Sequence, residues 1–210
     1  MKSLDKYEDL TTLGSLFLEG EALTHPEGTW WLYNRAKELG PEGVVIEVGT
    51  WCGWTAAVLA LGGPKVICID TFMMSDPFTK PSATLLRKRG ERHGTLDRHA
   101  LHLIELGLGE RVATVQAKSV EAAQAMGRGI ADFIFLDADH AYQEVINDLI
   151  AWEPVLKPGG LLCGDNWDSV KDVQKAVQYI LKSTFTTWPE ARKVANDIWV
   201  VEKPNTEGGK

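Results

Sequence analysis

The stretch VVIEVGTWCGWTAAVLA, residues 44–60, indicates how the chain folds. It opens with the apolar run 44–48, continues through a turn that contains Gly49 and Gly53, and ends in a run with the composition of a buried helix. A strand, a glycine-containing turn and a helix in this order form the opening unit of a parallel sheet with crossover helices. Glycines at the beginning of such a helix allow a ligand to approach the unpaired backbone amides. The stretch therefore predicts a ligand-binding turn as well as a fold.

The rest of the chain repeats this alternation of short apolar runs and longer helical patterns, which is typical of an α/β protein. Strands are expected at 44–48, 65–70, 112–116, 131–137 and 160–165, and two more are expected within STFTTW (183–188) and DIWVVEK (197–203). Helices are expected at about 27–40, 54–62, 95–107, 119–127, 141–156 and 169–182, with LKPGG at 156–160 as the clearest helix stop. We expect a single domain over residues 1–210, with an N-terminal helical segment over 1–40 and a loose tail over 204–210.

Composition and charge exclude several classes of protein. The 210 residues are 44% hydrophobic and 24% charged, which is typical of a globular domain. The net charge of -7 argues against a general nucleic-acid binder, because duplex affinity depends on neutralising phosphates. The charged N-terminus MKSLDKYEDL, and the lack of any apolar run near the roughly 18 residues of a membrane span, favour a soluble, cytoplasmic protein. The cysteines are odd in number and unclustered, so we expect reduced packing residues rather than a disulfide or zinc framework at Cys52, Cys68 and Cys163.

Acidic residues flank the glycine turn and end the next predicted strand. Glu47 stands just before the turn, and Asp70 follows Gly53 by seventeen residues. In doubly wound folds an acid at this strand end accepts hydrogen bonds from the two hydroxyls of a ribose. The turn has the spacing E-x-G-x-x-x-G and lacks the G-x-G-x-x-G of a nicotinamide site, which disfavours a dinucleotide. We therefore expect a nucleoside site; the alternative is that Asp70 merely caps the following turn.

Polar side chains also follow the fourth and fifth predicted strands. FLDADHAY places Asp137, Asp139 and His140 directly after an apolar strand. In GLLCGDNW, Asp165 and Asn166 come at the end of another apolar run. We expect these side chains to face the crevice at the carboxyl ends of the strands. Two carboxylates and an amide oxygen suit Mg²⁺ or another hard divalent ion. His140 is the leading candidate for a general base, because histidine ordinarily titrates near neutral pH.

Structural alternatives exist for each of these polar residues. The set Asp137, Asp165 and Asn166 is alternatively a metal-free cluster of caps and hydrogen bonds. His140 alternatively caps the following helix or bonds Asp139. Asp139 itself either supports the metal ligands from outside, without touching the ion, or is the N-cap of a helix that begins at 141.

The sequence over residues 27–203 resembles class I S-adenosylmethionine-dependent methyltransferases. The resemblance implies a Rossmann-like, doubly wound sheet of seven strands in the order 3-2-1-4-5-7-6, with the last strand antiparallel and helices on both faces. It also implies S-adenosylmethionine as the methyl donor. The positions that inherit donor contacts are Glu47, Gly49, Thr50 and Gly53 for the methionine end, Asp70 for the ribose, Ser119 in VQAKSVE for the adenosine, and Asp137 beside the donor.

The polar set further resembles two groups of cation-dependent O-methyltransferases. Asp137, Asp165 and Asn166 match the Asp, Asp, Asn metal set of the catechol and caffeoyl-CoA type. The stretch DADHAYQEVINDLIAWEPVLKPGGLLCGDNW resembles the macrocin and mycinamicin sugar enzymes, whose D-x-x-H pattern implies a metal-binding acid at Asp137 and a base at His140. The chain departs from both groups, because the catechol type carries a lysine near His140 and the sugar enzymes carry acids at the second metal pair. The resemblance implies an O-methyltransferase that uses Mg²⁺ or another hard divalent cation on a small hydroxylated substrate.

The sequence leaves two further functions open. In a metal-independent methyltransferase that acts on nitrogen or carbon, Asp137 and Asp165 would position an amine. A binding module that holds S-adenosylmethionine without catalysis is the alternative from another class.

Several segments have two interpretations each. The insertion at 71–94, which contains LLRKRGERHG, is either a substrate lid with cationic Arg87, Lys88, Arg89 and Arg92 or a surface loop. Trp51, Trp54 and Trp167 either line an acceptor pocket or pack between the sheet and the helices. Trp30, Trp31 and the leucines of LGSLFL are candidates for a homodimer face or a lid.

Overall fold

Within residues 4–17, 21–73 and 95–205, which the computed structural model describes, seven strands form one mixed sheet in the order β3-β2-β1-β4-β5-β7-β6. The strands are β1 (Val44–Val48), β2 (Lys65–Asp70), β3 (Val112–Gln116), β4 (Ala131–Leu136), β5 (Leu156–Gly164), β6 (Arg192–Ala195) and β7 (Ile198–Glu202). Strands β1 to β5 pair in parallel, whereas β7 pairs antiparallel with both β5 and β6. The predicted strand order and the antiparallel last strand are confirmed.

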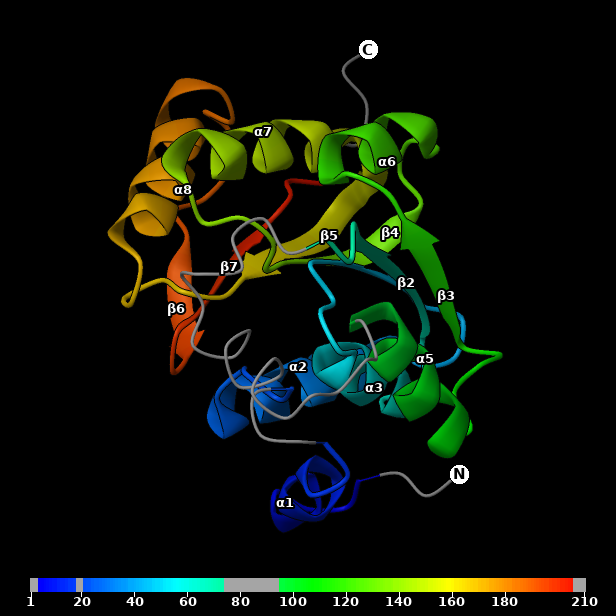
Figure 1. The fold of residues 1–210 in the computed structure, drawn as a ribbon. Helices are drawn as coiled ribbons and strands as arrows, with labels where there is room; N and C mark the ends of the chain where they lie inside the picture. The colour runs from blue at the N-terminus through cyan, green and yellow to red at the C-terminus, as the bar shows by residue number, and fades with distance from the viewer. Residues whose placement is uncertain (1–3, 18–20, 74–94, 206–210) are drawn as a thin grey trace.

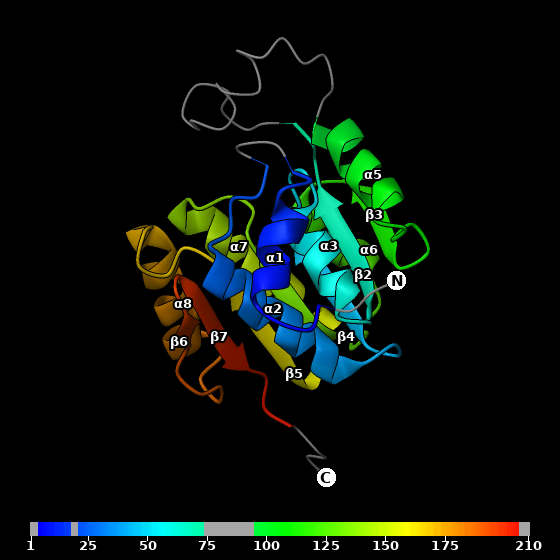
Figure 2. The same cartoon turned by 90° about the horizontal axis from the view of Figure 1, so that it is seen from below.

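Helices cover both faces of the sheet (Figure 1). One face carries α2 (Pro26–Leu39), α3 (Trp54–Leu61) and α5 (Thr95–Glu105), and the other carries α6 (Ser119–Ala125), α7 (Tyr142–Trp152) and α8 (Lys171–Ser183). The short helix α1 (Glu8–Gly14) lies outside α2 and α3, as the view from below shows (Figure 2). None of the helices in the described ranges is long and apolar enough to cross a membrane.

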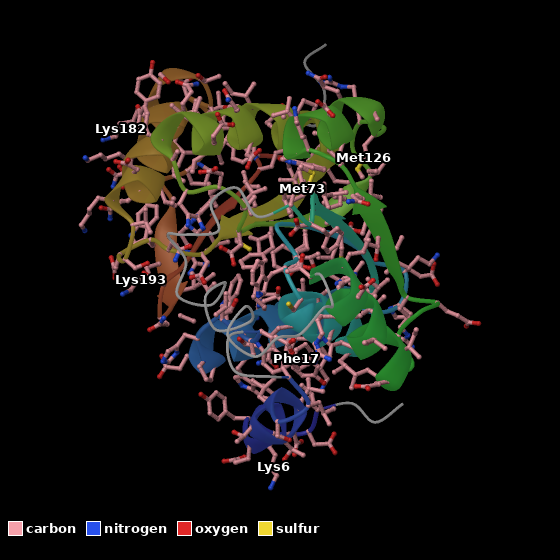
Figure 3. The ribbon with its side chains drawn as sticks, viewed as in Figure 1. Lys6, Phe17, Met73, Met126, Lys182 and Lys193 are labelled. Atoms are coloured by element: carbon pink, nitrogen blue, oxygen red, sulfur yellow. The ribbon has the colours of Figure 1, made fainter. Side chains whose placement is uncertain are left out.

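The central strands bury side chains on both faces, which explains their uninterrupted apolar runs. In β1, Val45 packs with the α2 and α3 layer, whereas Ile46 and Val48 pack with the layer of α6, α7 and α8. The N-terminal segment completes the first layer through Phe17, which lies between α1 and the layer of α3 and α5 (Figure 3). Its ring centroid is 5.1 Å from that of Trp54.

Two of the predicted strands differ clearly from the structure. The strand expected at 160–165 begins at Leu156, because the LKPGG stretch pairs with β4 through an irregular register rather than ending a helix there. The strand expected within STFTTW is wrong: α8 continues to Ser183, and the rings of Phe185 and Trp188 stack on each other with centroids 4.9 Å apart. The edge strand is β6, a few residues later.

The register of the sheet brings the predicted site to one edge. Val48 of β1 pairs with Ile69 of β2 and with Leu136 of β4, and Leu136 in turn pairs with Gly164 of β5. The residues at or just beyond these four strand ends therefore lie next to one another. They are Gly49, Asp70, Asp137 and Asp165.

Candidate functional site

The turn between β1 and α3 has a left-handed backbone at three positions. They are Gly49 (φ 91°), Trp51 (φ 51°) and Gly53 (φ 86°). A Cβ atom on Gly49 would lie 2.1 Å from the carbonyl oxygen of Asp137, and one on Gly53 would lie 2.6 Å from Nδ1 of His99. Glycine is thus required at both positions by the backbone and by the neighbouring atoms. The turn lies directly against the end of β4.

Glu47 lies beneath this turn and is fully buried. Its Oε1 accepts a hydrogen bond from Oγ1 of Thr55 in the first turn of α3, and its Oε2 accepts one from Sγ of Cys68 in β2 at 3.4 Å. Burial raises the pKa of the Glu47 carboxyl to about 7, more than the surrounding hydroxyl and thiol groups lower it. Glu47 therefore connects β1, β2 and α3 below the surface on which a ligand would lie.

Asp70 joins the end of β2 to the glycine turn. Its Oδ2 accepts a hydrogen bond from the backbone amide of Trp51 at 2.9 Å, and its Oδ1 accepts one from the amide of Phe72 at 2.7 Å. The contact with Phe72 is the turn cap that the sequence left as an alternative. Each carboxylate oxygen has two lone pairs, so both oxygens retain a position for a further donor such as a hydroxyl.

Asp137 and His140 form a pair at the end of β4. Nε2 of His140 lies 3.2 Å from Oδ1 of Asp137, and both side chains are partly exposed. The neighbouring Asp139 is exposed, and its Oδ1 accepts a hydrogen bond from the amide of Ala141 at 2.9 Å. Helix α7 begins at Tyr142, so Asp139 fixes the turn before the helix rather than its first residue. His140 bonds Asp137, not Asp139.

Asp165 and Asn166 follow β5 on the same edge. Burial, and next the charge of Asp137, raise the pKa of Asp165 to about 7. The amide nitrogen of Asn166 donates to Oδ1 of Asp165 at 2.8 Å, and the side-chain Nδ2 of Asn166 donates to Oγ of Ser169 at 3.1 Å. Asn166 has a left-handed backbone (φ 68°), which asparagine tolerates better than most residues.

In the part of the chain that is described, no group of three or more His, Cys, Asp or Glu side chains has a geometry that could hold a metal ion.

Ser119 begins α6, shortly after β3. Its hydroxyl donates to Oδ1 of Asp148 at 2.5 Å and accepts from Nε1 of Trp152 at 2.8 Å. Both partners belong to α7, so this side chain is engaged in the contact between α6 and α7. The structure brings the polar residues after β1, β2, β4 and β5 to one edge, while the Ser119 hydroxyl is directed to a helix contact.

Residues 46–167, more than half of the chain, match the family of methyltransferase domains. The chain belongs to this methyltransferase family. The matched segment of the methyltransferase contains all the predicted site residues from Glu47 to Asn166. Among curated proteins, none matches the sequence.

Solved structures with the same fold include several methyltransferases. An O-methyltransferase from Bacillus cereus, in complex with S-adenosylhomocysteine, has a TM-score of 0.64 and 16% identity over 97% of this chain and 93% of that chain. The O-methyltransferase TomG from Streptomyces achromogenes, involved in tomaymycin synthesis and solved with S-adenosylmethionine, has a TM-score of 0.61 and 14% identity over 97% and 91%. A protein from Corynebacterium glutamicum has a TM-score of 0.67 and 14% identity over 100% and 94%. This methyltransferase therefore has the fold that the resemblance implied.

The three tryptophans named for the rim differ in position. Trp54 is buried under α2, where its Nε1 donates to Oγ1 of Thr29 at 3.3 Å. Trp167 is buried beside Trp199, with ring centroids 6.4 Å apart. Trp51 is partly exposed within the glycine turn. Trp54 and Trp167 are therefore packing residues, as the alternative interpretation proposed. Of the three tryptophans, Trp51 is the one that is partly exposed, in the turn between β1 and α3.

Two supporting residues were not identified from the sequence. Thr55, which bonds Glu47, is a short polar residue in the first turn of an otherwise apolar helix, and that pattern is a usable signal. His99 packs against Gly53 from α5, and burial lowers its pKa to about 4, so its ring is neutral at neutral pH. No local sequence pattern connects His99 with Gly53, which lies 46 positions earlier in the chain.

The basic residues of the predicted lid lie outside the described residues, as does most of the insertion at 71–94.

Proposed function

We propose that this methyltransferase transfers a methyl group from S-adenosylmethionine to a hydroxyl of a small molecule, with Mg²⁺ or another hard divalent cation as a participant. The observation that carries the proposal is the position of two sets of residues on one edge of the sheet. The glycine turn and Asp70 form the first set, and the pair Asp137 and His140 with Asp165 forms the second. The structural neighbours from Bacillus cereus and Streptomyces achromogenes, which hold S-adenosylhomocysteine and S-adenosylmethionine respectively, support the choice of donor.

The donor would bind across the turn between β1 and α3. Asp70 would accept hydrogen bonds from the ribose hydroxyls through the lone pairs that the amides of Trp51 and Phe72 leave free. The first amides of α3 would attract the carboxylate of the methionine part, since a helix N-terminus is electropositive. Gly49 and Thr50 would contact the donor through backbone atoms of the turn, because Thr50 is only 2% exposed. The buried Glu47 would act indirectly by holding that turn in place.

The side chains at the ends of β4 and β5 carry the kinds of oxygen atom that a hard divalent cation prefers. Asp137 and Asp165 are carboxylates close enough for the charge of one to raise the pKa of the other, and a cation between them would relieve this repulsion. The Nδ2 group of Asn166 donates to Ser169, which leaves the amide Oδ1 available as a third oxygen. A bound cation would lower the pKa of an acceptor hydroxyl at this position.

His140 is suited to take the proton from that hydroxyl. Its Nε2 bonds the Asp137 carboxylate, so the proton of a neutral ring lies on Nε2, and Nδ1 can accept another. As the hydroxyl proton passes to Nδ1, the acceptor oxygen attacks the donor methyl carbon and the carbon–sulfur bond breaks. The products are a methyl ether, S-adenosylhomocysteine and a protonated His140, which Asp137 stabilises.

An acceptor screen with chelation tests the proposal. Transfer of labelled methyl from S-adenosylmethionine is measured with catechols, phenols, sugars and amines, with EDTA or added Mg²⁺. We expect transfer to a hydroxyl acceptor that EDTA abolishes and Mg²⁺ restores. Asp165→Ala should lose the response to Mg²⁺, whereas the control Asp168→Ala, at an exposed carboxylate three residues away, should retain it. Transfer to amines regardless of EDTA, or donor binding without transfer to any acceptor, would contradict the proposal and favour the two alternatives respectively.

A further inference from the structure

Trp199 of β7 has a buried polar group that no described residue satisfies. The side chain is 1% exposed, and its Nε1 has no hydrogen-bond partner within the described ranges. An indole N–H is a donor only, and a buried donor without an acceptor is unfavourable. Most such groups in folded proteins are bonded to protein atoms or to an ordered water.

The indole of Trp199 lies against the strand end that carries Asp165. Trp199 pairs with Gly164 across the antiparallel contact of β5 and β7. A Cβ atom on Gly164 would lie 2.7 Å from Cζ2 and 2.8 Å from Cε2 of the indole. Cε2 is the ring atom bonded to Nε1, so the edge that bears the N–H covers the residue immediately before Asp165. The missing side chain of Gly164 makes room for this contact.

A small cavity connects the two residues. Trp199 and Asp165 both line it, and its volume of about 10 Å³ is close to the minimum that can hold one water molecule. Its other polar lining residues are Asp139, His140 and Asp148. A buried water requires two to four polar partners, and this lining supplies them. Asp165 also has an oxygen to offer, since Oδ1 accepts from the amide of Asn166 and Oδ2 has no donor among the described residues.

We propose that one buried water accepts the Nε1 hydrogen of Trp199 and donates to Oδ2 of Asp165, which fixes the orientation of this carboxylate. Trp199 is then a positioning residue at the proposed site, although it contacts neither the methyl donor nor the methyl acceptor. The presence of the water does not depend on the reaction, whereas the effect on turnover rests on the proposed function. The water would also lie in the same cavity as the side chains of Asp139, His140 and Asp148.

A crystal structure of the wild-type protein is the first test. We expect a well-ordered water within hydrogen-bond distance of both Nε1 of Trp199 and Oδ2 of Asp165. The variant Trp199→Phe, which keeps an aromatic ring and removes the N–H, should lack this water. A wild-type structure in which Nε1 has another partner, or in which the water does not reach Asp165, would overturn the proposal. The wild-type result is decisive even if the variant fails to fold.

Kinetics are the second test, with an acceptor that the wild type methylates. Trp199→Phe should lower kcat about threefold to tenfold, the range for one hydrogen bond, and leave the KM of S-adenosylmethionine unchanged. The control Trp188→Phe, which keeps the stack on Phe185 after α8, should change neither value. Equal kcat values for Trp199→Phe and the wild type would refute the positioning role. If the wild type methylates nothing, the proposed function fails, and the crystal structures still decide for or against the water.

Discussion

Gly49→Ala tests the close contact between the glycine turn and the end of β4. The new Cβ would lie 2.1 Å from the carbonyl oxygen and 2.5 Å from the carbonyl carbon of Asp137, and both are backbone atoms that cannot rotate away. Alanine at φ 91° costs about 1–2 kcal/mol in backbone strain. Forcing an extra carbon into a packed site costs about 1–3 kcal/mol more. The variant should therefore lose about 2–5 kcal/mol of unfolding free energy.

The matched control is Gly107→Ala. Gly107 also has a positive φ of 66°, but nothing lies within 4 Å of an added Cβ. This control should lose only the strain of about 1–2 kcal/mol. Urea unfolding of both variants gives the two free energies, and titration with S-adenosylhomocysteine should show weaker binding for Gly49→Ala alone. Equal stability losses for the two variants would show that the turn does not press against Asp137, and the site geometry would have to be revised.

Three further changes have defined outcomes. Burial raises the pKa of Asp148 from 3.8 to about 6, so the folded state binds this proton more tightly, and the carboxyl should add stability as the pH falls from above 6 towards 3.8. The gain is at most about 3 kcal/mol for a shift of about two units, and Asp148→Asn should remove it when urea unfolding at pH 7 is compared with pH 4.5. Glu21→Ala should cost about 3–5 kcal/mol, because it removes the fully buried carboxylate that Arg98 contacts at 2.6 Å, while Asp168→Ala at an exposed ion pair should cost less than about 1 kcal/mol in the same assay. Asp70→Ala should weaken binding of S-adenosylhomocysteine at least tenfold more than binding of free methionine, which has no ribose. Calorimetry measures both, and an equal loss for the two ligands would contradict a ribose contact at Asp70.

The sheet could be predicted from the sequence because its signals are local. A parallel strand buried on both faces is a short apolar run, and the runs that became β1, β2, β3 and β4 were located to within one residue. STFTTW misled because β-branched and aromatic residues also suit a compact turn in which Phe185 and Trp188 stack. The helix α1 lies within the helical segment predicted over 1–40, but its own bounds were not predicted, since its seven residues are too few for a clear period.

The sequence predicted where the site residues lie in the fold better than it predicted the contacts that their side chains make. Asp70, Asp137 and Asp165 follow strand ends, and parallel strands bring such ends to one edge. The contact of Gly49 with Asp137 joins residues 88 positions apart, and no local pattern encodes it. For the same reason the sequence did not reveal that the Ser119 hydroxyl bonds α7.

A crystal structure of the wild-type protein with S-adenosylhomocysteine tests most directly whether the two sets of residues share one ligand site. We expect the ribose hydroxyls on the carboxylate of Asp70, with the sulfur directed towards Asp137 and His140. A ligand bound on another face, or one whose sulfur lies away from the ends of β4 and β5, would contradict it.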